Sequence, residues 1–224
     1  MSEEVVLRNK KKKKKSANRL KENILFVLYI LGALALAMVL KAYVITSMSI
    51  VGHSMSPTLE TGQTVVVYKL GKPKRFDIVT LKAPDGAMEN GQRKVYIKRV
   101  IGLPGDEVEY KNDTLYINGK PYDEPYLANL RQSLGEGQTL EPDRTLKQIL
   151  DSVKLTNSTL PEENTTLVQN EQGKYVIPEN HYFVLGDNRL NSKDGDEFGL
   201  ANANLLEGTA IFRFMPLDKI GPLK

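Results

Sequence analysis

The longest uninterrupted apolar stretch of the chain lies near its N-terminus. Residues 24–40 carry no charged side chain and would form a helix about 26 Å long at 1.5 Å per residue. Continuing past Lys41 to Ile45 brings the length to about 33 Å, close to the roughly 30 Å hydrocarbon core of a bilayer. Lys41 would then lie near one end and could extend to the lipid headgroups. We therefore predict one transmembrane helix over residues 24–45.

Two other interpretations of this stretch stay open. A cleaved signal peptide also combines a basic start with an apolar run, although this run is longer than usual and no clean small-x-small site follows it. A buried core helix fits less well, since six consecutive lysines (residues 10–15) stand just upstream. A signal anchor that stays in the membrane is the interpretation we favour.

Beyond this stretch the pattern changes to short runs of β-branched and aromatic residues. Val108, Tyr110, Leu115 and Ile117 alternate with polar positions, which predicts a hairpin over residues 106–117, and Asn118-Gly119 is typical of the next turn. Further strands are predicted at residues 64–68, 77–81, 94–101, 182–185 and 209–214. The fold class is therefore mainly β, behind one N-terminal membrane helix.

A polar, weakly patterned region interrupts the strands between Pro125 and about Lys174. One short helix is predicted in it, near residues 146–153. We interpret the region as an insertion, within about residues 107–180, that forms a mobile cap on the β core. The expected organisation is a basic tail (1–23), a span (24–45) and a catalytic domain (46–224).

Charge is divided unevenly along the chain. The whole chain carries 31 Lys+Arg and 27 Asp+Glu, a formal net charge of +4. Residues 1–23 hold nine of the basic and three of the acidic side chains, so this tail has a net charge of +6 and residues 24–224 have −2. The positive-inside rule places the tail in the cytoplasm and residues 46–224 outside the cell membrane. A nucleic-acid-binding domain needs its positive charge on the folded part, so no nucleic-acid partner is expected.

Composition also narrows the possible chemistry. The chain has no cysteine, which excludes disulfides, thiol catalysis and cysteine-bound metal. The two histidines, His53 and His181, argue against a histidine-rich metal site. We expect no cofactor and no metal.

Ser54 is the first candidate nucleophile. Adjacent residues on an extended strand point to opposite faces, so His53 cannot easily reach the Ser54 hydroxyl. His181 stays possible as the base, with Asp187 or Asp194 to orient it. The Gly-x-Ser-x-Gly elbow of α/β hydrolases is absent.

A lysine is the alternative base for such a serine. A free lysine titrates near 10.4, and lowering that to about 7–8 requires desolvation in an apolar pocket. Lys98 fits best because Tyr96, Ile97, Val100 and Ile101 surround it. On pattern alone, Lys98 as an outward-facing strand residue and Ser54 as an ordinary turn residue both stay open.

Four segments in order resemble the conserved boxes of bacterial type I signal peptidases. The nucleophile box is matched by Ser54-Met-Ser-Pro-Thr-Leu59, a shorter second box by Phe76-Asp-Ile-Val79, the lysine box by Tyr96-Ile-Lys-Arg-Val-Ile-Gly-Leu-Pro-Gly-Asp106, and the C-terminal box by Gly186-Asp-Asn-Arg-Leu-Asn-Ser192. The resemblance runs from about residue 20 to the C-terminus and leaves the polar insertion unmatched. Any one box is a weak signal, whereas four in the family's order are a strong one.

The resemblance implies a role for each matched residue. Ser54 would attack the scissile carbonyl and Lys98 would act as general base. Ser192 would orient that lysine, Asp194 would support the C-terminal box, and the backbone N–H of Ser54 would donate to the oxyanion. Apolar residues that would contact substrate, or alternatively pack in the core, are Ile50, Met55, Leu59, Tyr96 and Ile97. Such a lining suits small side chains and so the A-x-A rule for signal peptide cleavage.

Two departures from the family pattern stand out. Many members have a serine two residues before the nucleophile, whose hydroxyl assists the oxyanion hole, and here Gly52 stands there. The C-terminal box usually continues to Asp-Ser-Arg, whereas this chain has Asp194-Gly195-Asp196. An Asp–Arg ion pair at that place is therefore in doubt, with Arg189 or Arg99 as possible replacements.

The sequence thus predicts a membrane-anchored Ser/Lys endopeptidase that cleaves signal peptides from secreted preproteins. Its expected partners are those signal peptides and the lipid bilayer. The rival from another class is a membrane-tethered, non-enzymatic surface-binding module. A sortase-like transpeptidase is excluded because it needs a cysteine, and a soluble, DNA-binding Ser/Lys regulator suits neither the span nor the net charge.

Overall fold

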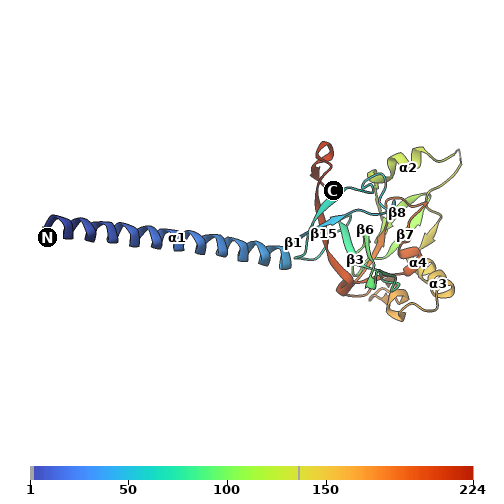
Figure 1. Ribbon diagram of the computed structural model, residues 1–224. Coiled ribbons are helices and arrows are strands. Elements are labelled where there is room, and N and C mark those ends of the chain that lie inside the picture. Colours follow the sequence, from blue (N-terminus) through green and yellow to red (C-terminus); the bar gives the residue numbers. More distant parts are fainter. Residues whose placement is uncertain (1–2, 136, 224) are drawn as a thin grey trace. The chain divides into compact units, whose positions relative to one another are not determined.

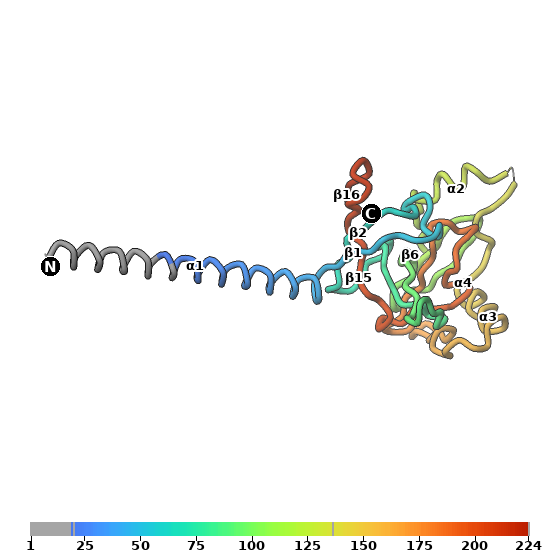
Figure 2. The backbone as a smooth tube through the Cα atoms, in the orientation of Figure 1, coloured from blue at the N-terminus to red at the C-terminus, as the bar shows by residue number. Residues whose placement is uncertain are grey.

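The computed structural model describes residues 3–135 and 137–223, with side chains from Arg19 onward apart from Leu20. The chain divides into two compact units, residues 1–45 and 46–224, and each is described by itself. Figure 1 labels the elements, and Figure 2 shows the path of the backbone through them.

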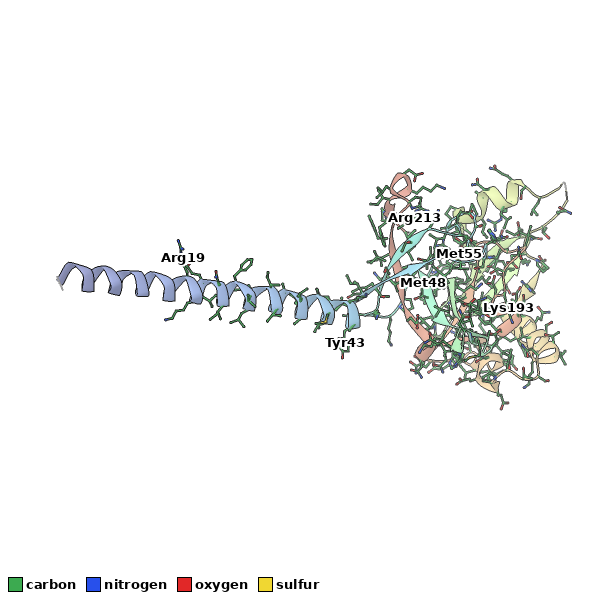
Figure 3. All side chains as sticks on the ribbon, in the orientation of Figure 1. Arg19, Tyr43, Met48, Met55, Lys193 and Arg213 are labelled. Carbon is green, nitrogen blue, oxygen red and sulfur yellow. The ribbon has the colours of Figure 1, made fainter. Side chains whose placement is uncertain are left out.

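The first unit is dominated by one long helix, α1 (Glu3–Tyr43). Its segment Lys21–Tyr43 has a mean hydropathy of 2.5 over 23 residues, about 35 Å at 1.5 Å per residue. Side chains project from all sides of this segment in Figure 3, and large apolar ones such as Phe26 and Leu36 are more than half exposed. A helix that is apolar all round is stable when protein or lipid covers it. By length and composition, this helix could span a membrane.

The second unit is built on an eight-stranded sheet. Seven strands lie in the order β1-β2-β15-β3-β6-β13-β14, and β16 pairs with β15. Their bounds are β1 (Ile45–Ser49), β2 (Thr64–Tyr68), β3 (Ile78–Lys82), β6 (Val95–Gly102), β13 (His181–Leu185), β14 (Ala201–Asn202), β15 (Leu206–Met215) and β16 (Gly221–Pro222). The mainly β class is confirmed. The sequence pattern missed β1, β14 and β16, which are short or lack β-branched residues in alternation.

Strand β6 lies inside this sheet and is covered on both faces. Its six residues from Ile97 to Gly102 are all buried. It pairs antiparallel with β3, where Lys98 lies opposite Val79, and antiparallel with β13, where Val100 lies opposite Val184. A lysine at this position is therefore held by strands on both sides.

A smaller sheet has the strand order β10-β7-β8-β9. Its strands are β7 (Val108–Lys111), β8 (Thr114–Ile117), β9 (Lys120–Tyr122) and β10 (Arg144–Thr145). Asn112 and Asp113 join β7 to β8, both with positive φ, as do Asn118 and Gly119 between β8 and β9. Two-residue hairpin turns need this left-handed backbone, which Asn, Asp and Gly adopt most readily. The predicted hairpin and Asn-Gly turn are confirmed.

Helix α3 (Leu146–Thr156) shows that the polar insertion contributes to the core. Leu146, Ile149, Leu150 and Val153 are buried in one cluster with Phe183 and other sheet residues. The prediction of a short helix here is confirmed. One face of α3 packs into the core, because a few apolar residues spaced for one helix face are enough to bury that face. The mobile cap stays a prediction.

Shorter elements complete the described part of the chain. They are β4 (Met88–Glu89), β5 (Gln92–Arg93), η1 (Pro125–Leu127), α2 (Ala128–Gln132), η2 (Glu162–Thr165), β11 (Val168–Gln169), β12 (Tyr175–Val176), α4 (Gly195–Phe198), η3 (Ala203–Leu205) and η4 (Leu217–Lys219).

Candidate active site

Lys98 is a buried lysine in the middle of β6. Its side chain is 3% exposed, and its ammonium nitrogen lies 5.7 Å from the centre of the Tyr96 ring. Nζ donates a 2.7 Å hydrogen bond to Ser192 Oγ and lies 2.6 Å from Asp194 Oδ1. The alternative of an outward-facing strand lysine is therefore wrong.

Ser192 and Asp194 form a closed polar triangle with this lysine. Ser192 Oγ donates to Asp194 Oδ1 at 2.5 Å. Asp194 is also the N-cap residue of α4, and its backbone oxygen accepts hydrogen bonds from the amides of Glu197 and Phe198. The start of α4 thus fixes the backbone that carries the carboxylate beside Lys98.

This chain has Asp194-Gly195-Asp196 in place of Asp-Ser-Arg, and the fold shows which cation pairs with Asp194. Lys98 itself is the ion-pair partner of Asp194. Arg99 is bound to Asp187, and Arg189 is bound to two glutamates. Neither arginine replaces the missing one, because each already neutralises a different buried carboxylate.

Ser54 lies in the turn region between β1 and β2 and is half-buried. Its backbone oxygen accepts a 3.0 Å hydrogen bond from the amide of Asn188. The side-chain amide of Asn188 donates to the oxygen of His53 at 3.1 Å. The C-terminal box therefore holds the nucleophile segment by its backbone, over a sequence separation that the boxes alone do not predict.

Gly186 is essential to this close approach. A Cβ atom placed on it would lie 2.3 Å from Ser54 O and 2.2 Å from Ser192 Oγ, well inside van der Waals contact. Only glycine fits where the strand end passes between the two serines.

Gly52 has a backbone reason to be glycine as well. Its φ of +96° lies in the left-handed region that side-chain-bearing residues rarely adopt. Its amide donates to Thr61 Oγ1, and its oxygen accepts from the same hydroxyl. The residue two before Ser54 thus shapes the turn, which accounts for the absence of a serine there.

Ser54 and Lys98 line one groove of about 580 Å³. Ser192, Tyr96 and Ile97 line it too. The other described residues along it are Met48, Ser49, Val51, Gly52, His53, Glu89, Asn90, Gln92, Arg93, Lys94, Val95, Asn191 and Lys193. Among the described residues, the Lys98 ammonium donates to Ser192 and not to Ser54. Ser54 and Lys98 are brought together by the groove that both line.

The predicted substrate contacts divide into two groups. Tyr96 and Ile97 line the groove. Ile50, Met55 and Leu59 are at most 2% exposed and pack in one core cluster with Val65 and Val67 of β2. These three side chains pack in the core beside the turn that carries Ser54, and they do not line the groove.

The histidine-based alternatives find no support in the geometry. His181 begins β13, with Nδ1 3.0 Å from Glu179 O and Nε2 3.9 Å from a carboxylate oxygen of Glu163. Asp187 is engaged with Arg99. His53 is well exposed, with Glu60 4.0 Å from its ring. The described contacts therefore build no Ser-His-Asp triad on Ser54.

Tyr96 is fixed in the groove wall by Asp85. Its hydroxyl lies 3.3 Å from both Asp85 oxygens, and Asp85 also pairs with Lys193 at 2.6 Å. Burial, followed by the nearby Asp85 charge and its hydrogen bond, raises the pKa of Tyr96 to about 12. The ring beside Lys98 is therefore a neutral phenol at physiological pH.

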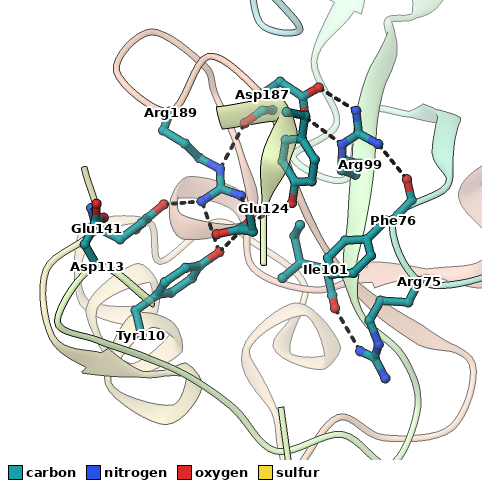
Figure 4. Close-up of polar contacts among 12 residues, drawn as sticks. Arg75, Phe76, Arg99, Ile101, Tyr110, Asp113, Glu124, Glu141, Asp187 and Arg189 are labelled. Atoms are coloured by element: carbon teal, nitrogen blue, oxygen red, sulfur yellow. Dashed lines mark hydrogen bonds and ion pairs between the residues drawn. The ribbon is translucent and has the colours of Figure 1, made fainter. Parts of the chain in front are cut away.

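Arg99 ties the start of the C-terminal box to β6. Two nitrogens of its guanidinium bind the two oxygens of Asp187 at 2.8 and 2.6 Å, and a third donates to Phe76 O. Figure 4 shows this fork beside a second one on Arg189. The Thr58 hydroxyl donates to Asp187 as well, so the nucleophile box and the lysine box meet at one carboxylate. The second box contacts the same arginine through Phe76 O.

Several residues at the site carry no signal in the sequence pattern. Asp85, Glu124 and Glu141 are acidic residues in segments without a matched motif. Their ion-pair partners at the site, Arg189 and Lys193, are distant in the sequence and come close only in the folded chain, so a single sequence does not reveal these pairs.

The chain is similar to known proteins over most of its length. The sequence model of the family described as signal peptidase, peptidase S26, matches residues 23–215. A signal peptidase I of Bacillus caldolyticus is 37% identical over 191 residues, which cover 84% of this chain and 88% of the relative. A signal peptidase IB of Staphylococcus aureus is 38% identical over 204 residues, which cover 89% and 93%. The crystal structure of a signal peptidase I from Enterococcus faecalis V583 is 35% identical and covers 62% of this chain and 97% of that chain, with a TM-score of 0.47. The chain therefore belongs to the signal peptidase family, peptidase S26, and is a hydrolase.

Proposed function

We propose that this chain is a membrane-anchored serine endopeptidase that removes N-terminal signal peptides from exported preproteins. The observation that carries the proposal is the groove that Ser54 and a buried Lys98 share in a chain of this family. Ser192 and Asp194 are the supporting residues, because both contact the lysine nitrogen.

The chemistry follows the logic of an activated serine. The reaction requires Lys98 to have lost the extra proton that it carries in the ion pair with Asp194. The uncharged Lys98 then takes the proton of the Ser54 hydroxyl as Ser54 Oγ attacks the scissile carbonyl. Lys98 then gives that proton to the leaving amine, which leaves an acyl-enzyme on Ser54. Water hydrolyses the ester, with Lys98 again as base. The Ser54 amide is the proposed oxyanion donor, and a lost donor of this kind costs about 10²–10³ in rate.

Topology supports the choice of substrate. We place residues 1–23 in the cytoplasm, residues 24–45 in the membrane and residues 46–224 outside, on the basis of the +6 tail and the apolar helix. About nine residues separate Ile45 from Ser54, a reach of at most about 30 Å. A preprotein whose own apolar segment lies in the bilayer presents its cleavage site near that height.

The test is cleavage of a preprotein by the full chain in detergent or liposomes. Ser54→Ala and Lys98→Met are each expected to lower kcat by roughly 10⁴-fold or more. Matched controls are Ser152→Ala and Lys82→Met, which change an exposed serine and an exposed lysine outside the groove.

A serine-directed acylating probe separates the two classes of function. The peptidase is expected to be labelled at Ser54. A folded chain that is neither labelled nor active would favour a membrane-tethered binding module. Full activity in either single variant would exclude the dyad.

A further inference from the structure

Arg189 is a buried arginine at the centre of the C-terminal box, and its side chain is 3% exposed. One nitrogen lies 2.5 Å from Glu124 Oε1, and another lies 2.7 Å from Glu141 Oε1 and 3.0 Å from the Tyr110 hydroxyl. Its Nε donates to the backbone oxygen of Gly186 at 3.1 Å. Figure 4 shows the two glutamates reaching the guanidinium from different sides.

Both glutamates come from the part of the chain that matches no family box. Glu124 follows β9 and Glu141 precedes β10, and their side chains are 0% and 4% exposed. Each has a second cationic neighbour, Arg131 at 3.5 Å from Glu124 and Arg144 at 2.9 Å from Glu141. Burying charges without partners is costly, so the loss of either acid would leave Arg189 with one opposite charge in place of two.

The arginine in turn fixes the loop that carries the site. Residues 186–192 belong to no strand or helix, so individual hydrogen bonds and ion pairs determine where the loop lies. Through its bond to Gly186 O, Arg189 closes the turn that places Asn188 against Ser54 and Ser192 against Lys98.

We propose that Glu124 and Glu141 are positioning residues for the reaction at Ser54. They act through Arg189 on the loop 186–192. This inference rests on the proposed function, since it assigns a role in the same reaction. The insertion is therefore part of the catalytic framework through two carboxylates, and not only through the packing of α3.

The test uses Glu124→Gln, Glu141→Gln and the double variant in the full chain in detergent. Each single change is expected to lower kcat about 10- to 100-fold, as a displacement near 1 Å does, while KM changes less than about twofold. The rate of acylation at Ser54 should fall in parallel. The double variant should lose much less than the product of the two single effects, because both acids hold one arginine.

Asp151→Asn is the control. Asp151 is another carboxylate of the insertion with a cationic partner, Lys147, at 2.6 Å, and it lies outside the loop 186–192 and outside the four boxes. The change should leave kcat per folded molecule unchanged. Unchanged kcat in folded glutamate variants, a change in KM alone, or an equal loss of kcat in the control would each overturn the proposal.

Hydrogen exchange of the amides in residues 186–192 separates this inference from the proposed function. Exchange should quicken in the glutamate variants and not in the control. If the unaltered chain fails to cleave preproteins, the proposed function falls, and exchange alone decides whether the acids hold the loop. Unchanged exchange would overturn the inference whatever the activity.

Discussion

Lys98 shows how a single residue is defined by its surroundings. The same side chain on an edge strand would be an ordinary surface lysine. On β6 it is enclosed by Tyr96, Ser192 and Asp194, and its nitrogen has two fixed polar neighbours. The order of the family boxes pointed to Lys98, Ser192 and Asp194 together, but the ion pair between Lys98 and Asp194 became evident only in the fold.

At the residue scale, the ionisation of Tyr96 predicts how the stability of the chain depends on pH. Its pKa is about 12 in the folded chain, above the ordinary value near 10 of an unfolded chain. Between these two pKa values the folded state keeps a proton that the unfolded state loses. The free energy of unfolding is therefore unaffected by Tyr96 below about pH 10 and falls as pH rises toward 12. Between pH 9 and 11, the urea midpoint of the unaltered chain should fall further than that of Tyr96→Phe. Equal falls would contradict the assignment.

The apolar residues near Ser54 mark a limit of inference from sequence. Ile50, Met55 and Leu59 neighbour the nucleophile along the chain, and an apolar residue there has the same pattern whether it contacts substrate or core. The path of the turn between β1 and β2 decides which, and here all three pack in the cluster with Val65 and Val67. Tyr96 and Ile97 lie next to Lys98 on β6 and do line the groove.

At the scale of elements, α3 is the clearest success of periodicity in a region of polar composition. A short helix was predicted near residues 146–153, and Leu146, Ile149, Leu150 and Val153 are the residues that it buries. Thr145 and Gln148 form a capping box at its start, a signal that the prediction did not use. Glu124 and Glu141 had no such local signal, since their partner Arg189 is 65 and 48 residues away in the sequence.

The capping box predicts a measurable loss of stability. Thr145 Oγ1 accepts from the Gln148 amide, and Gln148 Oε1 accepts from the Thr145 amide at 2.8 Å. Thr145→Ala should lower the free energy of unfolding by about 1 kcal/mol in urea titration. Thr156→Ala is the control, because that hydroxyl is at the other end of α3 and bonds to Ser152 O within the helix. A smaller loss for Thr145→Ala than for the control would argue against the cap.

At the scale of the whole molecule, charge and hydropathy separate along the chain. The +6 tail precedes the apolar helix, and the remaining residues carry −2. The helix and the β unit were predicted as separate parts from composition alone. Which residues of the β unit meet in the groove depends on long-range pairing, which composition does not record.

The membrane orientation can be measured directly. In protoplasts that contain the full chain, added protease should digest residues from 46 onward and spare an epitope tag at the N-terminus. Carbonate extraction should leave the chain in the membrane fraction, since an apolar helix of this length does not depend on surface charge for binding. Loss of the tag in intact protoplasts would show the opposite orientation.

The hairpin formed by β4 and β5 offers a route to engineering. These two strands form a two-stranded sheet of their own, separate from the ladder that contains β6. Three of their four residues, Glu89, Gln92 and Arg93, face the groove. Libraries of substitutions or grafted loops at this hairpin would alter the recognition surface and leave Lys98 and its ladder intact. This makes the hairpin the natural starting point for retargeting the groove to new peptide sequences.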